Sequence, residues 1–141
     1  MKNTNASLSK ANYVYELKKG DLYFFDDYLI SQIHNNKSIN KYDLIEVINL
    51  INKHYGSNKP YGFINFNVNS YDINPMDVLS LMDEFGYCIA NVVVTKSNLA
   101  LRSYELEKRL LKFKGTSFEN LIDAKEWILK QVNKVKKHSK N

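Results

Sequence analysis

The sequence repeats one short motif, Asn-x-x-Asp, at three points where a strand-like run of residues gives way to a helix-like run. These copies are Asn40–Asp43, Asn74–Asp77 and Asn120–Asp123, and a fourth copy, Asn69–Asp72, lies in a polar segment. An asparagine at a helix N-cap accepts a hydrogen bond from a backbone N–H of the first turn, and an acidic residue three positions later can return the bond. Three such caps predict at least three strand-to-helix transitions, and therefore an α/β fold.

Length and composition favour one globular domain. The 141 residues are 44% hydrophobic and include five glycines and two prolines, which argues against a disordered or fibrous chain. We expect residues 1–11 to be a disordered N-terminus, residues 12–132 to form a single domain, and residues 133–141 to form a basic, flexible tail.

Location and redox state follow from two further features. No apolar run approaches the roughly 20 residues that a membrane-spanning helix needs, and the polar start Met1–Lys10 lacks a signal-peptide core. We therefore expect a cytoplasmic protein. The single cysteine, Cys88, lies in the apolar run Tyr87–Val94, which predicts a buried strand thiol and excludes an intramolecular disulfide.

The formal charge of +5 is concentrated at the C-terminus. Five lysines follow Leu129, and residues 1–129 carry 15 basic and 15 acidic groups. A solvated basic tail explains this pattern better than nucleic-acid binding, because base recognition favours arginine and the chain has 18 lysines against two arginines. Weak binding of nucleic acid through the tail is the least favoured alternative.

The N-terminal third predicts strands. Tyr13–Leu17 and Leu22–Phe25 are aromatic and β-branched runs that flank Lys18–Asp21, whose glycine suits a hairpin turn. Tyr28–Ile33 predicts a third strand, or the second half of one bent strand that begins at Leu22. His34–Ile39 is expected to be a polar linker.

The middle of the chain alternates helices and strands. The helix after Asn40 has a narrow polar stripe, which predicts burial of most of its circumference up to Gly56. A strand to Phe66 and a polar loop, Asn67–Ile73, are expected next. Asn74 then caps a helix with Pro75 in its first turn that continues to Phe85.

The last third predicts a strand and two more helices. Tyr87–Thr95 is apolar enough to be a central strand covered on both faces. Ser97–Leu111 predicts a helix with three leucines on its inner face. After the short run Lys112–Phe118, a helix from Asn120 places several apolar side chains on one face. The expected inner residues of these two helices are Leu99, Leu106, Leu110, Leu121, Ala124, Ile128, Val132 and Val135, with Trp127 beside them.

This order predicts a single small α/β domain with a mixed sheet, an N-terminal β-hairpin and about four helices. The chain resembles the SpoIIAA-like superfamily, which includes STAS and SEC14 domains, and especially small uncharacterised STAS/SEC14-like proteins of Bacteroidetes. The segments that carry the resemblance are Asp26–Ile30, Asn69–Pro75, Leu106–Lys108 and Phe118–Trp127.

The resemblance implies binding or regulation and names no catalytic residue. STAS domains of the anti-sigma-factor-antagonist type carry a phosphorylated serine in an Asp-Ser-x-Gly setting at a strand-to-helix junction. The corresponding junction here is Asn67–Pro75, where Ser70 is the nearest hydroxyl and no such motif occurs. No phosphorylation site is therefore transferred.

The sequence contains no recognisable catalytic or metal-binding set, so we expect neither an enzyme nor a cofactor. His34, His54 and His138 have no ligand spacing and are expected to be solvated or close to caps. Asp26 and Asp27 are adjacent, so on a strand they would point to opposite faces.

The best candidate for a functional surface is the loop before the second helix. Asn69, Ser70, Tyr71 and Asn74 form the proposed contact residues for a partner or an anion, because helix N-termini present free N–H groups. A well-capped structural loop is the alternative, since Asn74 and Asp77 can satisfy these donors themselves.

The aromatic hairpin is the second candidate surface. Some of its rings must join the core, and an exposed remainder more often marks protein association than nucleic-acid binding. The rings are those of Tyr13, Tyr15, Tyr23, Phe24, Phe25 and Tyr28.

These observations favour a non-enzymatic STAS-like module that acts through protein–protein interaction, including self-association. The alternative is a SEC14-like domain that binds a small ligand or lipid, and it requires an apolar cavity.

Overall fold

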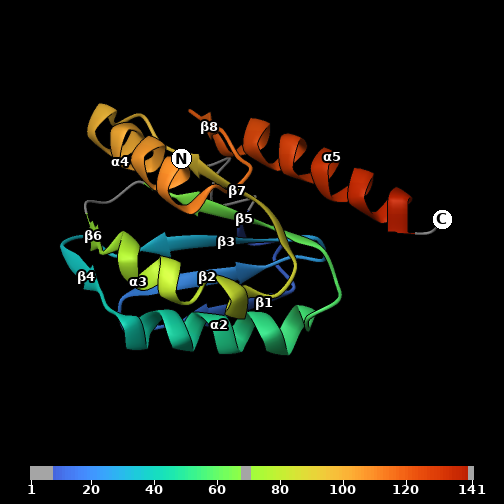
Figure 1. The fold of residues 1–141 in the computed structure, drawn as a ribbon, viewed down its shortest axis with the longest axis horizontal. Coiled ribbons are helices and arrows are strands. Elements are labelled where there is room, and N and C mark those ends of the chain that lie inside the picture. Colours follow the sequence, from blue (N-terminus) through green and yellow to red (C-terminus); the bar gives the residue numbers. More distant parts are fainter. Residues whose placement is uncertain (1–7, 68–70, 140–141) are drawn as a thin grey trace.

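The computed structural model describes residues 8–67 and 71–139. Six strands form the main sheet in the order β1-β2-β3-β5-β7-β8 (Figure 1). They are β1 (Tyr13–Glu16), β2 (Gly20–Phe24), β3 (Tyr28–Ile33), β5 (Tyr61–Phe66), β7 (Cys88–Val94) and β8 (Ser117–Phe118). The helices are α2 (Lys41–Tyr55), α3 (Pro75–Ser80), α4 (Asn98–Leu111) and α5 (Leu121–Ser139), and a 3-10 helix, η1 (Met82–Phe85), follows α3.

The N-terminal strands form an antiparallel meander. β1 pairs with β2 and β2 pairs with β3, both antiparallel, which confirms the hairpin. The alternative of one bent strand from Leu22 to Ile33 is wrong. The chain reverses at residues 25–27, and Tyr23 lies opposite Ile30 in the register of β2 and β3.

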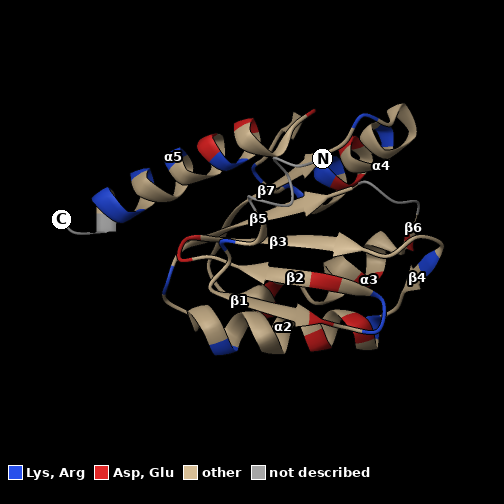
Figure 2. Ribbon diagram, turned by 180° about the vertical axis from the view of Figure 1, so that it is seen from behind, with Lys and Arg blue, Asp and Glu red and all other residues tan. Residues whose placement is uncertain are grey.

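The rest of the main sheet is parallel, and its crossover helices gather on one face. β3, β5, β7 and β8 are parallel neighbours in chain order. Right-handed crossovers that always advance in the same direction along a sheet place their helices on the same side. α2, α3 and α4 make these crossovers, whereas α5 packs on the opposite face against β5 and β7 (Figures 1 and 2).

Side-chain alternation along the strands divides the core in two. Ile30, Ile64 and Val92 pack with Ile128 of α5. The neighbouring Leu29 faces α2 with the remainder of the second cluster, which comprises Leu22, Phe24, Ile51, Tyr55 and Tyr61. Because successive strand residues point to opposite faces, this division follows directly from the period of two.

Two segments that were expected to be irregular contribute a second, two-stranded sheet. β4 (Lys37–Ile39) and β6 (Tyr71–Ile73) pair in parallel, with Ile39 opposite Ile73. The predicted linker His34–Ile39 and loop Asn67–Ile73 therefore each contain a strand. Three-residue strands with polar positions lack the alternation by which strands are recognised, which explains why both were missed.

The three Asn-x-x-Asp motifs all begin helices, in three different ways. Asn40 and Asp43 form a complete capping box on α2. At α5, the Asp123 amide donates to the Asn120 side chain at 2.9 Å, and the two side chains also bond to each other. At α3, the Asn74 side chain accepts from the Met76 amide instead, because Pro75 begins a helix of only six residues.

The buried faces of α2 and α4 differ from those predicted. α2 buries one face only, and Ile45 is exposed. On α4 the three leucines expected inside are exposed, with Leu99 73% and Leu106 62% accessible. α4 instead buries Tyr104 and Leu111, because its spacing of apolar residues is compatible with two faces and the sheet contacts the other one.

Both ends of the domain extend beyond their predicted limits. Leu8, placed in the expected disordered segment 1–11, is buried in the core against α5, whereas residues 1–7 lie outside the described part. α5 continues through the predicted tail as far as Ser139, and Lys136 forms an ion pair with Asp27. None of the described helices is long and apolar enough to cross a membrane.

Close packing of α5 on the sheet depends on one glycine. Gly62 of β5 lies directly beneath Ile128, and a methyl group at its Cα would overlap the Ile128 side chain. Ile128 is fully buried, so it has no free space into which to move.

We therefore expect Gly62→Ala to lower the free energy of unfolding by about 1–3 kcal/mol, as overpacked core sites do. Urea denaturation monitored by circular dichroism measures the change. In a double-mutant cycle the same substitution should cost much less in an Ile128→Ala background, where the overlapping atoms are absent. Equal costs in both backgrounds would contradict the proposed contact.

Candidate functional site

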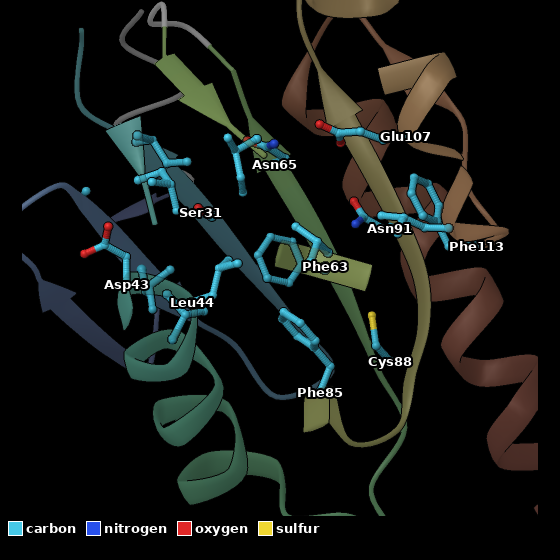
Figure 3. A pocket seen from close by; sticks show the side chains of 18 of the residues that line it. Ser31, Asp43, Leu44, Phe63, Asn65, Phe85, Cys88, Asn91, Glu107 and Phe113 are labelled. Atoms are coloured by element: carbon cyan, nitrogen blue, oxygen red, sulfur yellow. The ribbon is translucent and has the colours of Figure 1, made fainter. Parts of the chain in front are cut away.

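A cavity of about 450 Å³ lies between the main sheet and the helices of its crossover face (Figure 3). Its floor is formed by side chains of β2, β3, β5 and β7, and its walls come from α2, η1 and α4. β6 and β4 close one end with Tyr71, Ile73 and Ile39. Most of the lining is apolar, with Phe63 and Phe85 in the middle.

The cavity exists because the middle crossover is too slight to fill the space. α2 and α4 are 15 and 14 residues long, but the crossover between β5 and β7 consists of the six-residue α3 and the four-residue η1. Neither of these short elements buries a residue. These two elements therefore cover this part of the sheet, but their side chains do not fill the space between them and the strands.

An uncharged polar residue interrupts three of the four floor strands. Ser31 of β3 and Asn65 of β5 are register partners, and Asn91 of β7 lies opposite Phe63. All three line the cavity. A polar side chain in the middle of an apolar strand is the sequence signal for this site, but the overall hydrophobicity of each strand masks it.

Asn65 leaves one end of its amide unpaired at the cavity wall. Its Nδ2 donates to the Tyr71 hydroxyl at 2.5 Å. Its Oδ1 is buried and has no hydrogen-bond partner in the structure. A buried polar atom without a partner costs free energy, and this oxygen lies too deep for a water-sized group to reach it.

Glu107 of α4 brings a carboxyl group to the same end of the cavity (Figure 3). Among the described residues it forms no hydrogen bond or ion pair, and burial raises its pKa. The adjacent Lys108 does not neutralise it, because the Lys108 Nζ donates to the Gly115 carbonyl at 2.6 Å. Glu107 gave no sequence signal, since the face of α4 that points inward was predicted incorrectly.

A second hollow of about 300 Å³ adjoins this polar end. It extends over the start of α4 and is lined by Ser97, Ala100 and Ser103. Both hollows share the side chains of Asn65, Tyr71, Tyr104 and Glu107. The polar cluster therefore lies where an apolar chamber meets a more polar one.

The structure describes two of the four residues of the predicted contact loop and gives them different roles. Tyr71 lies at the cavity, where burial raises the pKa of its hydroxyl. Asn74 is used as the cap of α3, which makes it a structural residue here. Asn69 and Ser70 lie outside the described residues. The described part of the loop carries Asp72 and faces Glu107, and these acids disfavour an anion at this end.

The remaining candidates have structural roles. His54 lies in the last turn of α2, close to the C-cap as one of the two expectations has it, and its ring stacks on Phe24 at 4.3 Å and bonds to the Tyr15 hydroxyl at 2.8 Å. Asp26 and Asp27 lie in a turn instead of on a strand; Asn12 donates to Asp26, and Asp27 pairs with the C-terminal helix. No group of three or more potential metal-ligating side chains occurs within residues 8–67 and 71–139.

No protein-family model and no curated protein matches the chain. Among solved structures, it is similar to an uncharacterised protein of the DUF3478 family from Shewanella loihica PV-4, which has a SpoIIAA-like fold. The likeness covers 82% of this chain and 90% of that chain, with a TM-score of 0.56 and 14% sequence identity. It confirms the SpoIIAA-like fold, and the narrower resemblance to Bacteroidetes proteins stays a prediction.

Cys88 provides a reporter at the cavity wall. It is partly buried, whereas a buried strand thiol was expected, because it borders the cavity. Its Sγ lies 3.5 Å from the Ala90 carbonyl, and desolvation raises its pKa to about 11.

We expect N-ethylmaleimide to modify Cys88 at pH 8 about a hundredfold more slowly in the folded protein than in urea, because only the thiolate reacts and the pKa is raised from 9.0 to about 11. Mass spectrometry over time measures both rates. The folded rate should continue to rise between pH 9 and 10, where the unfolded rate levels off. Equal rates at pH 8 would contradict the desolvated thiol.

Proposed function

We propose that this protein is a non-catalytic module that binds a small, mainly apolar molecule in the cavity beneath α3 and η1. The observation that carries the proposal is the cavity itself, whose volume of about 450 Å³ lies within the range of about 300–1,000 Å³ typical of small-molecule sites. An apolar lining with a few converging polar groups is the usual design of such sites. The volume suits a compact ligand better than a two-chain lipid.

The chemistry of the lining supports binding without reaction. Catalysis by a nucleophile requires an adjacent base within hydrogen-bond reach. The Cys88 thiol contacts a backbone carbonyl and has a raised pKa, which keeps it protonated at neutral pH. Glu107 has no hydrogen-bond partner in the described part of the chain that it could activate.

The cytoplasmic location expected from the sequence stays a prediction.

A second candidate function, association with a protein, rests on the edge strand β1. Within the described residues β1 pairs with a strand on one side only, and its outer surface exposes Tyr13 at 60% and Val14 at 48%. An exposed apolar edge strand is a template for pairing with another chain. Self-association through β1 is the simplest form of this hypothesis.

Binding of the neutral dye Nile red tests the cavity. We expect dye fluorescence to rise with wild-type protein and the dissociation constant to increase at least tenfold for Val78→Trp, which fills space from the loosely packed α3. Leu106→Trp is the matched control, because Leu106 is exposed on α4 and lines neither hollow. Equal dye binding by the two variants would contradict binding in the cavity.

Sedimentation velocity tests the edge strand. If β1 mediates self-association, Val14→Lys should weaken the dimer at least tenfold, because lysine on an edge strand opposes further pairing. Ile122→Lys serves as control, since Ile122 is 51% exposed on α5, which packs against β5 and β7 on the opposite face of the sheet. A wild-type protein that stays monomeric at all concentrations would remove the self-association hypothesis.

A further inference from the structure

We propose that the polar end of the cavity binds the ammonium group of an amine ligand, with Glu107 as its counter-charge and the apolar part of the ligand in the main chamber. The inference rests on the small-molecule function proposed above and names the chemical class of that ligand. Two properties of the site support it: a carboxylate that forms no hydrogen bond or ion pair with another described residue, and an adjoining chamber whose lining is mainly apolar.

The carboxyl group of Glu107 is partly buried and has no partner among residues 8–67 and 71–139. It lines both hollows, yet no described residue forms an ion pair or hydrogen bond with it. Carboxylates removed from water are normally paired, because an isolated buried charge costs far more than a paired one. A ligand cation supplies the missing partner and gains a charge-assisted hydrogen bond in a setting of reduced dielectric constant.

The lysines that line the main cavity do not serve as this partner. Lys19 is held at the opposite side by Asp43 at 2.7 Å and by the Ser38 carbonyl at 2.8 Å. Lys108, the neighbour of Glu107 in the chain, donates to the Gly115 carbonyl. The other lining lysines, Lys18, Lys112 and Lys114, are exposed.

Tyr71 adds a hydroxyl oxygen at the same place. An ammonium group has three N–H donors, and the site offers the two oxygens of Glu107 together with the second lone pair of the Tyr71 hydroxyl. Tyr71 bonds to Asn65 and interacts electrostatically with Glu107, so the three side chains form one cluster. An alcohol can form a hydrogen bond here but leaves the carboxylate without a counter-charge, and a ligand carboxylate is repelled by it.

Three ligands of one shape separate these alternatives: 4-phenylbutylamine, 4-phenylbutanol and 4-phenylbutyrate, titrated calorimetrically at pH 7.5. We expect the amine to bind wild-type protein at least tenfold more tightly than the alcohol, and the carboxylate to bind most weakly. Glu107→Gln should bring the amine and the alcohol within about threefold of each other. Glu105→Gln, which removes the same charge from an exposed site on the same helix, should preserve the preference.

The outcomes distinguish the inference from the function on which it rests. If Nile red binds in the cavity but wild-type protein does not prefer the amine, or if Glu107→Gln retains the preference, the assignment of an amine is overturned and the cavity function stands. If neither the dye nor any of the three ligands binds, both proposals are overturned. The ranking on wild-type protein alone decides the inference should Glu107→Gln fail to fold.

Discussion

All three helical crossovers of this domain must lie on one face of the sheet, because β3, β5, β7 and β8 are added in the same direction and right-handed connections permit no other side. The opposite face is then covered by α5, which comes last in the chain and packs closely over Gly62. The crossover face is shared by helices of very unequal length. The middle of this face is covered by the shortest helices, α3 and η1, and the cavity lies beneath them.

This arrangement separates the densely packed face of the sheet from the face that carries the cavity. The α5 face is a conventional core, where Ile30, Ile64 and Val92 are fully excluded from solvent. On the other face, Ser31 and Asn65 occupy positions that aliphatic residues would fill in a packed sheet. The crossover face is packed only in part: Leu29, Ile51 and Tyr61 are fully buried there, but the polar groups and empty volume beside them lower stability, which the denser α5 face offsets.

Sequence patterns predicted where the helices and strands lie better than they predicted what these elements pack against. Helix starts were predicted well because a cap such as Asn40 acts through bonds within four residues. The inner face of α4 was predicted incorrectly. Leu99 and Leu106 have the spacing of one helix face, but this spacing does not show whether that face lies against the sheet or in solvent. The cavity depends on a length mismatch between separate helices, and Glu107 becomes significant only through Asn65, more than 40 positions away. No local pattern contains that information.

The small β4–β6 sheet links the two covers of the cavity mechanically. β4 ends at Ile39, immediately before the cap of α2, and β6 ends at Ile73, immediately before the cap of α3. Since Ile39 and Ile73 are register partners, the starts of these two helices are joined side by side (Figure 1). Because Tyr71 of β6 also lines the cavity, this small sheet joins the cavity wall directly to the starts of both helices.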